Sequence, residues 1–131
     1  MDMSKFQRPK TKDEYIKAHR DMWYWISKEN ISRKKKVFPY NYFKAMRIKN
    51  KPIGYSFLCE YNDNAKRIKK PDRCKNCLIK WENLIGKESE RCLGSIYTVY
   101  CQIPDDNYIF AADIAQRIAD LPEILVYYDI L

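Results

Sequence analysis

A helical repeat of apolar residues begins shortly after Thr11. An apolar side chain recurs every three or four positions, at Tyr15, Ala18 or His19, Met22, and Trp25 or Ile26. This spacing predicts an amphipathic helix over residues 12–30, and Trp23 widens its apolar face. Thr11 and Glu14 have the spacing of a capping box, which marks the start of a helix. The aromatic-rich face is typical of a buried core, and a docking face for a partner is the alternative.

Three further segments are also predicted to be helical. A short helix over residues 41–48 follows Pro39 and carries Phe43 and Met46 on one side. Residues 94–103 fit helical spacing, although their Tyr, Thr and Val content would also suit a strand, and we predict a helix. A helix over residues 108–120 is ended by Pro122. The predicted apolar face of this last helix consists of Phe110, Ile114, Ile118 and Leu121.

The chain of 131 residues has a suitable length for one domain, residues 1–131, which we expect to be mainly α-helical. We divide it into a flexible start (1–10), a basic helical part (11–58), a zinc module (59–92), a second helical part (93–122) and an apolar tail (123–131). Residues 59–92 contain few apolar side chains, so burial alone cannot stabilise them. The predicted fold is therefore a small helical domain built around a four-cysteine zinc-knuckle module, with room for one short β element.

Four of the five cysteines follow the pattern C-x14-C-x2-C-x14-C, at Cys59, Cys74, Cys77 and Cys92. The chain starts without a signal-peptide hydrophobic stretch, which predicts a cytoplasmic protein, where disulfides are rare. Two thiolates separated by two residues can bind one ion, and two flanking thiolates complete the tetrahedral sulfur shell of structural zinc. We therefore predict one structural Zn²⁺. A redox Cys-x-x-Cys pair and unrelated thiols are the alternatives.

Cys101 and His19 are the remaining candidate metal ligands. Cys101 lies in an apolar stretch, where a buried structural thiol is expected, although it could replace Cys59 in the pattern C-x2-C-x14-C-x8-C. His19 is the only histidine, and we expect it on a helix surface. A shell of four sulfur ligands leaves no position for water, so the predicted metal would stabilise the fold without taking part in catalysis.

Positive charge is concentrated in the first part of the chain. The net charge is +8; residues 1–80 hold 22 basic and 8 acidic side chains, whereas residues 81–131 hold 3 and 9. Such a field attracts nucleic acids and acidic protein surfaces alike, and a solvated, solubilising face is the alternative. The candidate binding face for a partner or nucleic acid consists of Arg33, Lys34, Lys35, Lys36, Lys44, Arg47, Arg67, Lys69 and Lys70.

Several short motifs follow one another over residues 11–122. They are Thr11-x-x-Glu14-Tyr15, His19-x-x-Met22-Trp23-x-Trp25-Ile26, Tyr42-Phe43, Cys59, Cys74-x-x-Cys77 followed by Trp81, Cys92, and Ala115-x-x-Ile118-Ala119-x-Leu121-Pro122. In this order they resemble a group of small uncharacterised proteins of phages and prophages of Gram-positive bacteria. The resemblance implies a zinc-binding accessory protein with the same four cysteines as ligands.

Our first functional hypothesis is stoichiometric binding that inhibits or redirects a bacterial host (defence) protein or protein–nucleic-acid complex. The first alternative is direct, largely sequence-independent binding of DNA or RNA through the basic face. The second alternative is sequestration of a small phosphorylated signalling molecule. We do not expect an enzyme, because the sequence has no histidine pair, no nucleophile motif and only three glycines, too few for a phosphate-binding loop. We also expect no membrane partner.

Overall fold

The computed structural model describes residues 7–49, 57–58, 79, 81–82, 88–89 and 96–122. This part of the chain is mainly helical, as predicted. Its helices are α1 (Lys12–Arg33), α2 (Pro39–Ala45), α4 (Ile96–Gln102) and α5 (Tyr108–Ala119). The strands β1 (Trp81–Glu82) and β2 (Glu88–Ser89) pair antiparallel and form the short β element for which the sequence left room. Among the described helices, none has the length and apolar character needed to cross a membrane.

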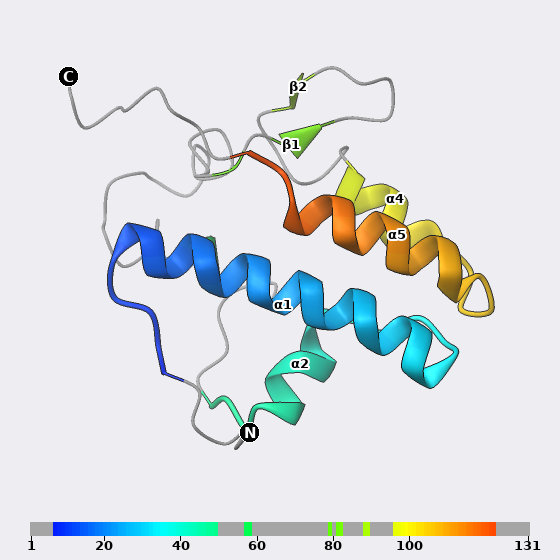
Figure 1. The fold of residues 1–131 in the computed structure, drawn as a ribbon, viewed down its shortest axis with the longest axis horizontal. Coiled ribbons are helices and arrows are strands. Elements are labelled where there is room, and N and C mark those ends of the chain that lie inside the picture. Colours follow the sequence, from blue (N-terminus) through cyan, green and yellow to red (C-terminus); the bar gives the residue numbers. More distant parts are fainter. Residues whose placement is uncertain are drawn as a thin grey trace.

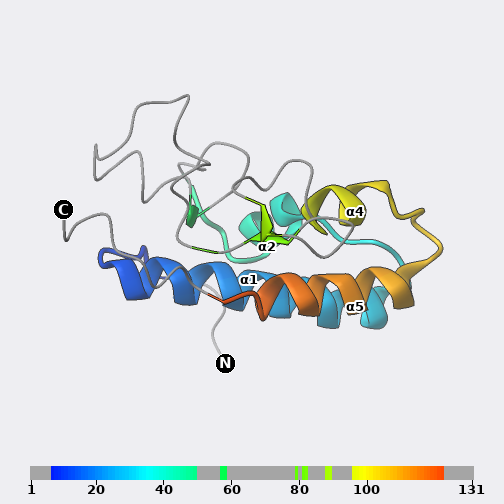
Figure 2. The same cartoon turned by 90° about the horizontal axis from the view of Figure 1, so that it is seen from above.

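The helices form two layers (Figure 2). Helices α1 and α5 lie side by side and run in opposite directions, while α2 and α4 both lie on the same side of this pair. The core fills the space between the layers. There the ring of Trp23 meets Tyr100 of α4 edge to face, with 5.2 Å between ring centroids, and Phe43 of α2 stacks on Phe57 at 5.1 Å. Aromatic side chains thereby connect segments that lie far apart in the sequence.

The predicted first helix is confirmed, together with its capping box. The hydroxyl oxygen of Thr11 accepts a hydrogen bond from the amide of Glu14, and the Glu14 carboxylate accepts one from the amide of Thr11. The helix continues three residues beyond the predicted end. An ion pair of 2.8 Å between Glu29 and Arg33, one turn apart, supports this last turn. Lys34 then adopts the left-handed conformation, with φ of 55°, and ends the helix.

Helix α5 is confirmed in its position, and three residues of its predicted apolar face, Ile114, Ile118 and Leu121, are buried. The fourth, Phe110, is not in the core, since 44 % of it is exposed. Four alanines that the prediction did not include are buried on α5 together with Ile114 and Ile118. Small side chains let the two backbones approach closely, so that Oγ of Ser27 reaches the carbonyl oxygen of Ala112 at 2.7 Å. A bulky Phe110 does not fit such a contact.

Two further expectations are corrected. His19 is buried between α1 and α5 and is not on the surface, and its ring bonds to the backbone of Ile118. Cys101 has a free thiol on an exposed position of α4 and is not a buried one. Before α1, Pro9 is buried and a guanidinium nitrogen of Arg8 donates to the Lys49 carbonyl at 3.0 Å; the predicted flexibility of residues 1–10 stays a prediction.

Other predictions fall on residues that the structure does not describe. They concern the four predicted zinc ligands, most of the zinc module, the apolar tail, and Arg67, Lys69 and Lys70.

Candidate functional site

Residues 30–49, which we call the basic segment, run from the end of α1 through α2. The basic segment contains seven Lys and Arg residues and no Asp or Glu. Six of the seven cations are exposed, namely Arg33, Lys34, Lys35, Lys44, Arg47 and Lys49. The structure thus exposes all the described residues of the predicted binding face except Lys36.

Lys36 departs from this group because its side chain is buried. Its ammonium donates hydrogen bonds to the carbonyl oxygens of Tyr100 at 3.1 Å, Cys101 at 3.0 Å and Ile103 at 2.7 Å. These carbonyls end α4, where the helix dipole favours a positive charge. Lys36 therefore stabilises the fold, and its charge is not available to a partner.

A buried polar network holds the start of the basic segment in place. The amide of Val37 donates to Oδ1 of Asn30 at 2.6 Å, and Nδ2 of Asn30 donates to the Tyr100 hydroxyl at 3.1 Å. The Tyr100 hydroxyl donates in turn to the carbonyl of Val37. Burial raises the pKa of the Tyr100 hydroxyl to about 12, so the hydroxyl stays protonated. The chain between α1 and α2 therefore leaves the core along a fixed path.

An aromatic pair lies at the start of α2. The rings of Phe38 and Tyr40 stack nearly parallel, with an angle of 6° and 5.8 Å between centroids, and half of Tyr40 is exposed. Asn41 accepts a hydrogen bond from the Phe38 amide at 2.9 Å and so orders the first turn. The stack supports one side of the Tyr40 ring, and its exposed part is directed to solvent.

Two exposed cations follow Tyr40 in the chain. Lys44 lies four residues after Tyr40 in α2, so both side chains project from one side of the helix. The amide of Arg47 donates to the Lys44 carbonyl at 3.2 Å, which brings the backbone of Arg47 next to Lys44. We call Tyr40, Lys44 and Arg47 the Tyr40 surface.

Arg33 is less free than its exposure suggests. Besides its ion pair with Glu29, its guanidinium lies over the ring of Trp25 at 5.4 Å. Trp25 in turn packs edge to face on Tyr42, with 5.4 Å between centroids. Arg33 therefore stabilises the contact between α1 and α2. Lys34 and Lys35 are the exposed cations of this turn for which the structure shows no such contact.

The role of Asn30 was not predicted from the sequence. For Asn30 a signal was present, because it lies four residues after Ile26 and continues the buried stripe of α1. For Tyr40 no local signal separates it from Tyr42, which is 5 % exposed.

The described residues contain no group of three or more His, Cys, Asp or Glu side chains placed to bind a metal. Comparisons with protein-family models, with curated proteins and with solved structures gave no match. The resemblance to phage and prophage proteins therefore stays a prediction.

Proposed function

We propose that the protein acts by binding, and that its basic segment contacts single-stranded nucleic acid with little sequence preference. The observation that carries this proposal is the Tyr40 surface, where a half-exposed ring supported by Phe38 shares one side of α2 with exposed Lys44, and exposed Arg47 follows three residues later. Proteins that bind single strands combine cations that contact phosphates with aromatic rings on which bases stack. Lys34 and Lys35 add charge at the adjoining turn, and no carboxylate of the segment opposes them.

The test compares binding of a fluorescent oligothymidine to the full-length protein and to variants of the Tyr40 surface. Stacking of one base contributes about 1–3 kcal/mol, so Tyr40→Ala is expected to weaken binding roughly 5- to 150-fold. Tyr40→Phe keeps the ring and should retain most of the affinity. Phe110→Ala is the matched control, because Phe110 is exposed to a similar degree on α5. Equal losses in Tyr40→Ala and Phe110→Ala would contradict the proposal.

We also propose that Cys59, Cys74, Cys77 and Cys92 bind one structural Zn²⁺. The support is the spacing of the four cysteines together with the few apolar residues of their segment. All-sulfur zinc sites stabilise small modules that cannot fold by burial alone, and binding free energies reach about 10–16 kcal/mol in zinc-finger peptides.

Elemental analysis of the purified protein tests the zinc proposal, with about one equivalent of zinc per chain expected. Cys74→Ser should lower the zinc content and the yield of folded protein, because a missing thiolate opens the shell. Cys101→Ser is the matched control, since Cys101 is exposed on α4. Protein that contains no zinc, or equal losses in the two variants, would contradict this ligand set.

A second candidate function is contact with a host protein, so that the protein inhibits or redirects a defence protein or a protein–nucleic-acid complex. The observation that favours it is the exposure of large apolar side chains on the α1–α5 layer. The exposed fractions are 67 % for Ile109, 44 % for Phe110 and 49 % for Ile31. Exposed apolar groups often mark protein contacts.

Affinity capture from a host lysate, with and without nuclease treatment, distinguishes the two functions. Nuclease should abolish co-purification if nucleic acid bridges the contact, and leave it intact if a protein is bound directly. Under the second function Phe110→Asp should lose the partner, whereas under the first function it should retain oligonucleotide binding.

A further inference from the structure

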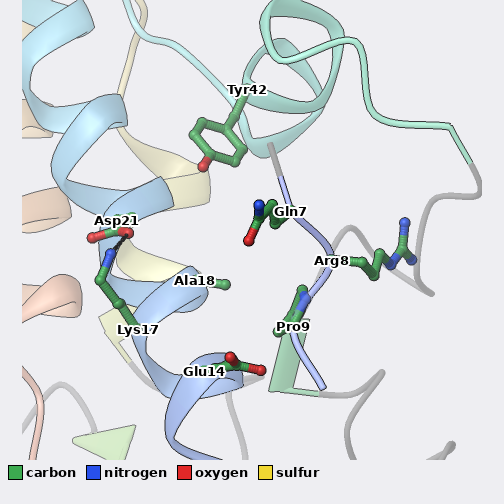
Figure 3. A pocket seen from close by; sticks show the side chains of 8 residues that line it. All are labelled: Gln7, Arg8, Pro9, Glu14, Lys17, Ala18, Asp21 and Tyr42. Atoms are coloured by element: carbon green, nitrogen blue, oxygen red, sulfur yellow. Dashed lines mark hydrogen bonds and ion pairs between the residues drawn. The ribbon is translucent and has the colours of Figure 1, made fainter. Parts of the chain in front are cut away.

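A cavity of about 350 Å³ is lined by residues that do not belong to the Tyr40 surface (Figure 3). Its walls are the N-terminal segment at residues 7–9, the first half of α1, and Tyr42 of α2. Gln7 and Tyr42 approach it from one side, and Ala18 forms part of its floor. The volume is at the lower end of the range for small-molecule sites.

The Tyr42 hydroxyl is the central polar group of this cavity. The side chain is 95 % buried, since only 5 % is exposed, and its ring is fixed by edge-to-face contacts with Trp25 and Phe57. The hydroxyl is directed into the cavity, and no described residue forms a hydrogen bond with it. Burial and the nearby charge of Asp21 raise the pKa of Tyr42 to about 12. The hydroxyl oxygen is not among the buried unpaired atoms of the described residues, so it is open to a ligand in the cavity.

Two carboxylates of α1 supply further hydrogen-bond acceptors. Oε1 of Glu14 accepts from the amides of Lys10 at 2.8 Å and Thr11 at 3.1 Å, which leaves Oε2 for another donor. Oδ2 of Asp21 accepts from Lys17 at 2.6 Å, which leaves Oδ1. The cavity thus combines two carboxylate oxygens and the hydroxyl oxygen of Tyr42 as acceptors.

The two cations that line the cavity are already engaged. Lys17 forms the ion pair with Asp21. The guanidinium of Arg8 points away from the cavity and donates to the Lys49 carbonyl at 3.0 Å (Figure 3). The available groups therefore favour a ligand that donates hydrogen bonds and carries positive charge.

We propose that this cavity binds a small organic cation, with a guanidinium or primary ammonium head and a short alkyl chain. The head donates to the carboxylates of Asp21 and Glu14 and to the oxygen of Tyr42. Pro9 and Ala18 offer apolar contact to the alkyl chain. This site is separate from the Tyr40 surface and does not depend on the proposed nucleic-acid binding.

The probe is agmatine, titrated into the full-length protein and followed by NMR chemical-shift changes. We expect saturable binding with a Kd on the order of 1 mM, as suits a small and open site. Butylurea, which has a similar shape without charge, and succinate, which carries the opposite charge, should bind at least about tenfold more weakly. Absence of agmatine binding, or tighter binding of succinate, would overturn the proposal.

Variants test the named groups. Tyr42→Phe removes the hydroxyl and keeps the ring, and Asp21→Asn removes an exposed charge, so both should fold and both should weaken agmatine binding about tenfold. Asp13→Asn is the matched control, because Asp13 lies in the same helix but does not line the cavity. Unchanged binding in both cavity variants, or an equal loss in the control, would also overturn the proposal.

A blocked Gly-Arg-Gly peptide distinguishes two sources of the same head group. Agmatine binding at least as tight as that of the peptide assigns the cavity to a free small molecule. Binding of the peptide about tenfold tighter than agmatine assigns it to an arginine side chain of a polypeptide.

Discussion

His19 is buried against α5 as a neutral imidazole. Removal from water and, to a smaller extent, the charge of Arg20 lower its pKa from 6.5 to about 3, against the opposing effect of the hydrogen bond with the Ile118 backbone. Between pH 6.5 and about 3 the unfolded chain therefore binds a proton that the folded chain excludes. The contribution of His19 to stability is complete above pH 6.5 and decreases as the pH falls below that value.

We predict that the free energy of unfolding decreases below pH 6.5 by up to about 1.4 kcal/mol for each pH unit. Urea unfolding between about pH 7.5 and pH 5 measures the slope. Glu14 and Asp120 titrate below this pH range, because their hydrogen bonds lower the pKa of each carboxyl group. His19→Gln should remove most of the slope, and an unchanged slope in this variant would exclude His19 as its source.

Lys36 provides a second prediction for a single residue. Lys36→Met keeps the length of the side chain but leaves the three carbonyls at the end of α4 without their donor. We expect the free energy of unfolding to fall by about 2–3 kcal/mol. Lys35→Met is the matched control, since Lys35 is exposed, and it should change stability by less than about 0.5 kcal/mol. Chemical denaturation of both variants measures the difference, and equal effects would contradict the buried role of Lys36.

At the scale of the element, the end of α1 carries conformational strain. Lys34 adopts a left-handed conformation, with φ of 55°, which is unfavourable for a residue with a Cβ atom. Lys34→Gly is therefore expected to raise the free energy of unfolding by about 1 kcal/mol. Lys35→Gly should not raise it, because φ of Lys35 is not positive. Thermal unfolding of the two variants checks the prediction, and stabilisation by both would contradict it.

The positions of the helices could be predicted from periodicity, but their contacts could not. Helix α4 forms despite the β-prone residues of its sequence, because Ile96 and Tyr100 share one buried face at helical spacing. In α5 the pattern of large apolar residues correctly identified Ile114, Ile118 and Leu121 as buried, but it wrongly added Phe110 and did not include the four buried alanines. Close approach of two helices depends on small side chains, and the sequence does not reveal which helix is the partner.

At the scale of the whole molecule, the candidate site could be predicted only in part. The sequence identified the exposed cations of the basic segment, because a run of like charges normally faces solvent. It did not separate Lys36 from Lys35, since the burial of Lys36 depends on the end of α4, more than 60 residues away along the chain. The burial of Tyr42 against Trp25 and Phe57 and the cavity beside it likewise depend on tertiary contacts.

Binding of nucleic acid by the basic segment is the central functional claim. Its most direct test is the affinity for oligothymidine as a function of salt concentration, for the unmodified protein and for Lys44→Gln/Arg47→Gln. We predict that log affinity falls linearly with log salt, and that the slope of the variant is smaller by about 1.4, because two phosphate contacts are lost. The same slope in both proteins, or no binding at low salt, would contradict the claim.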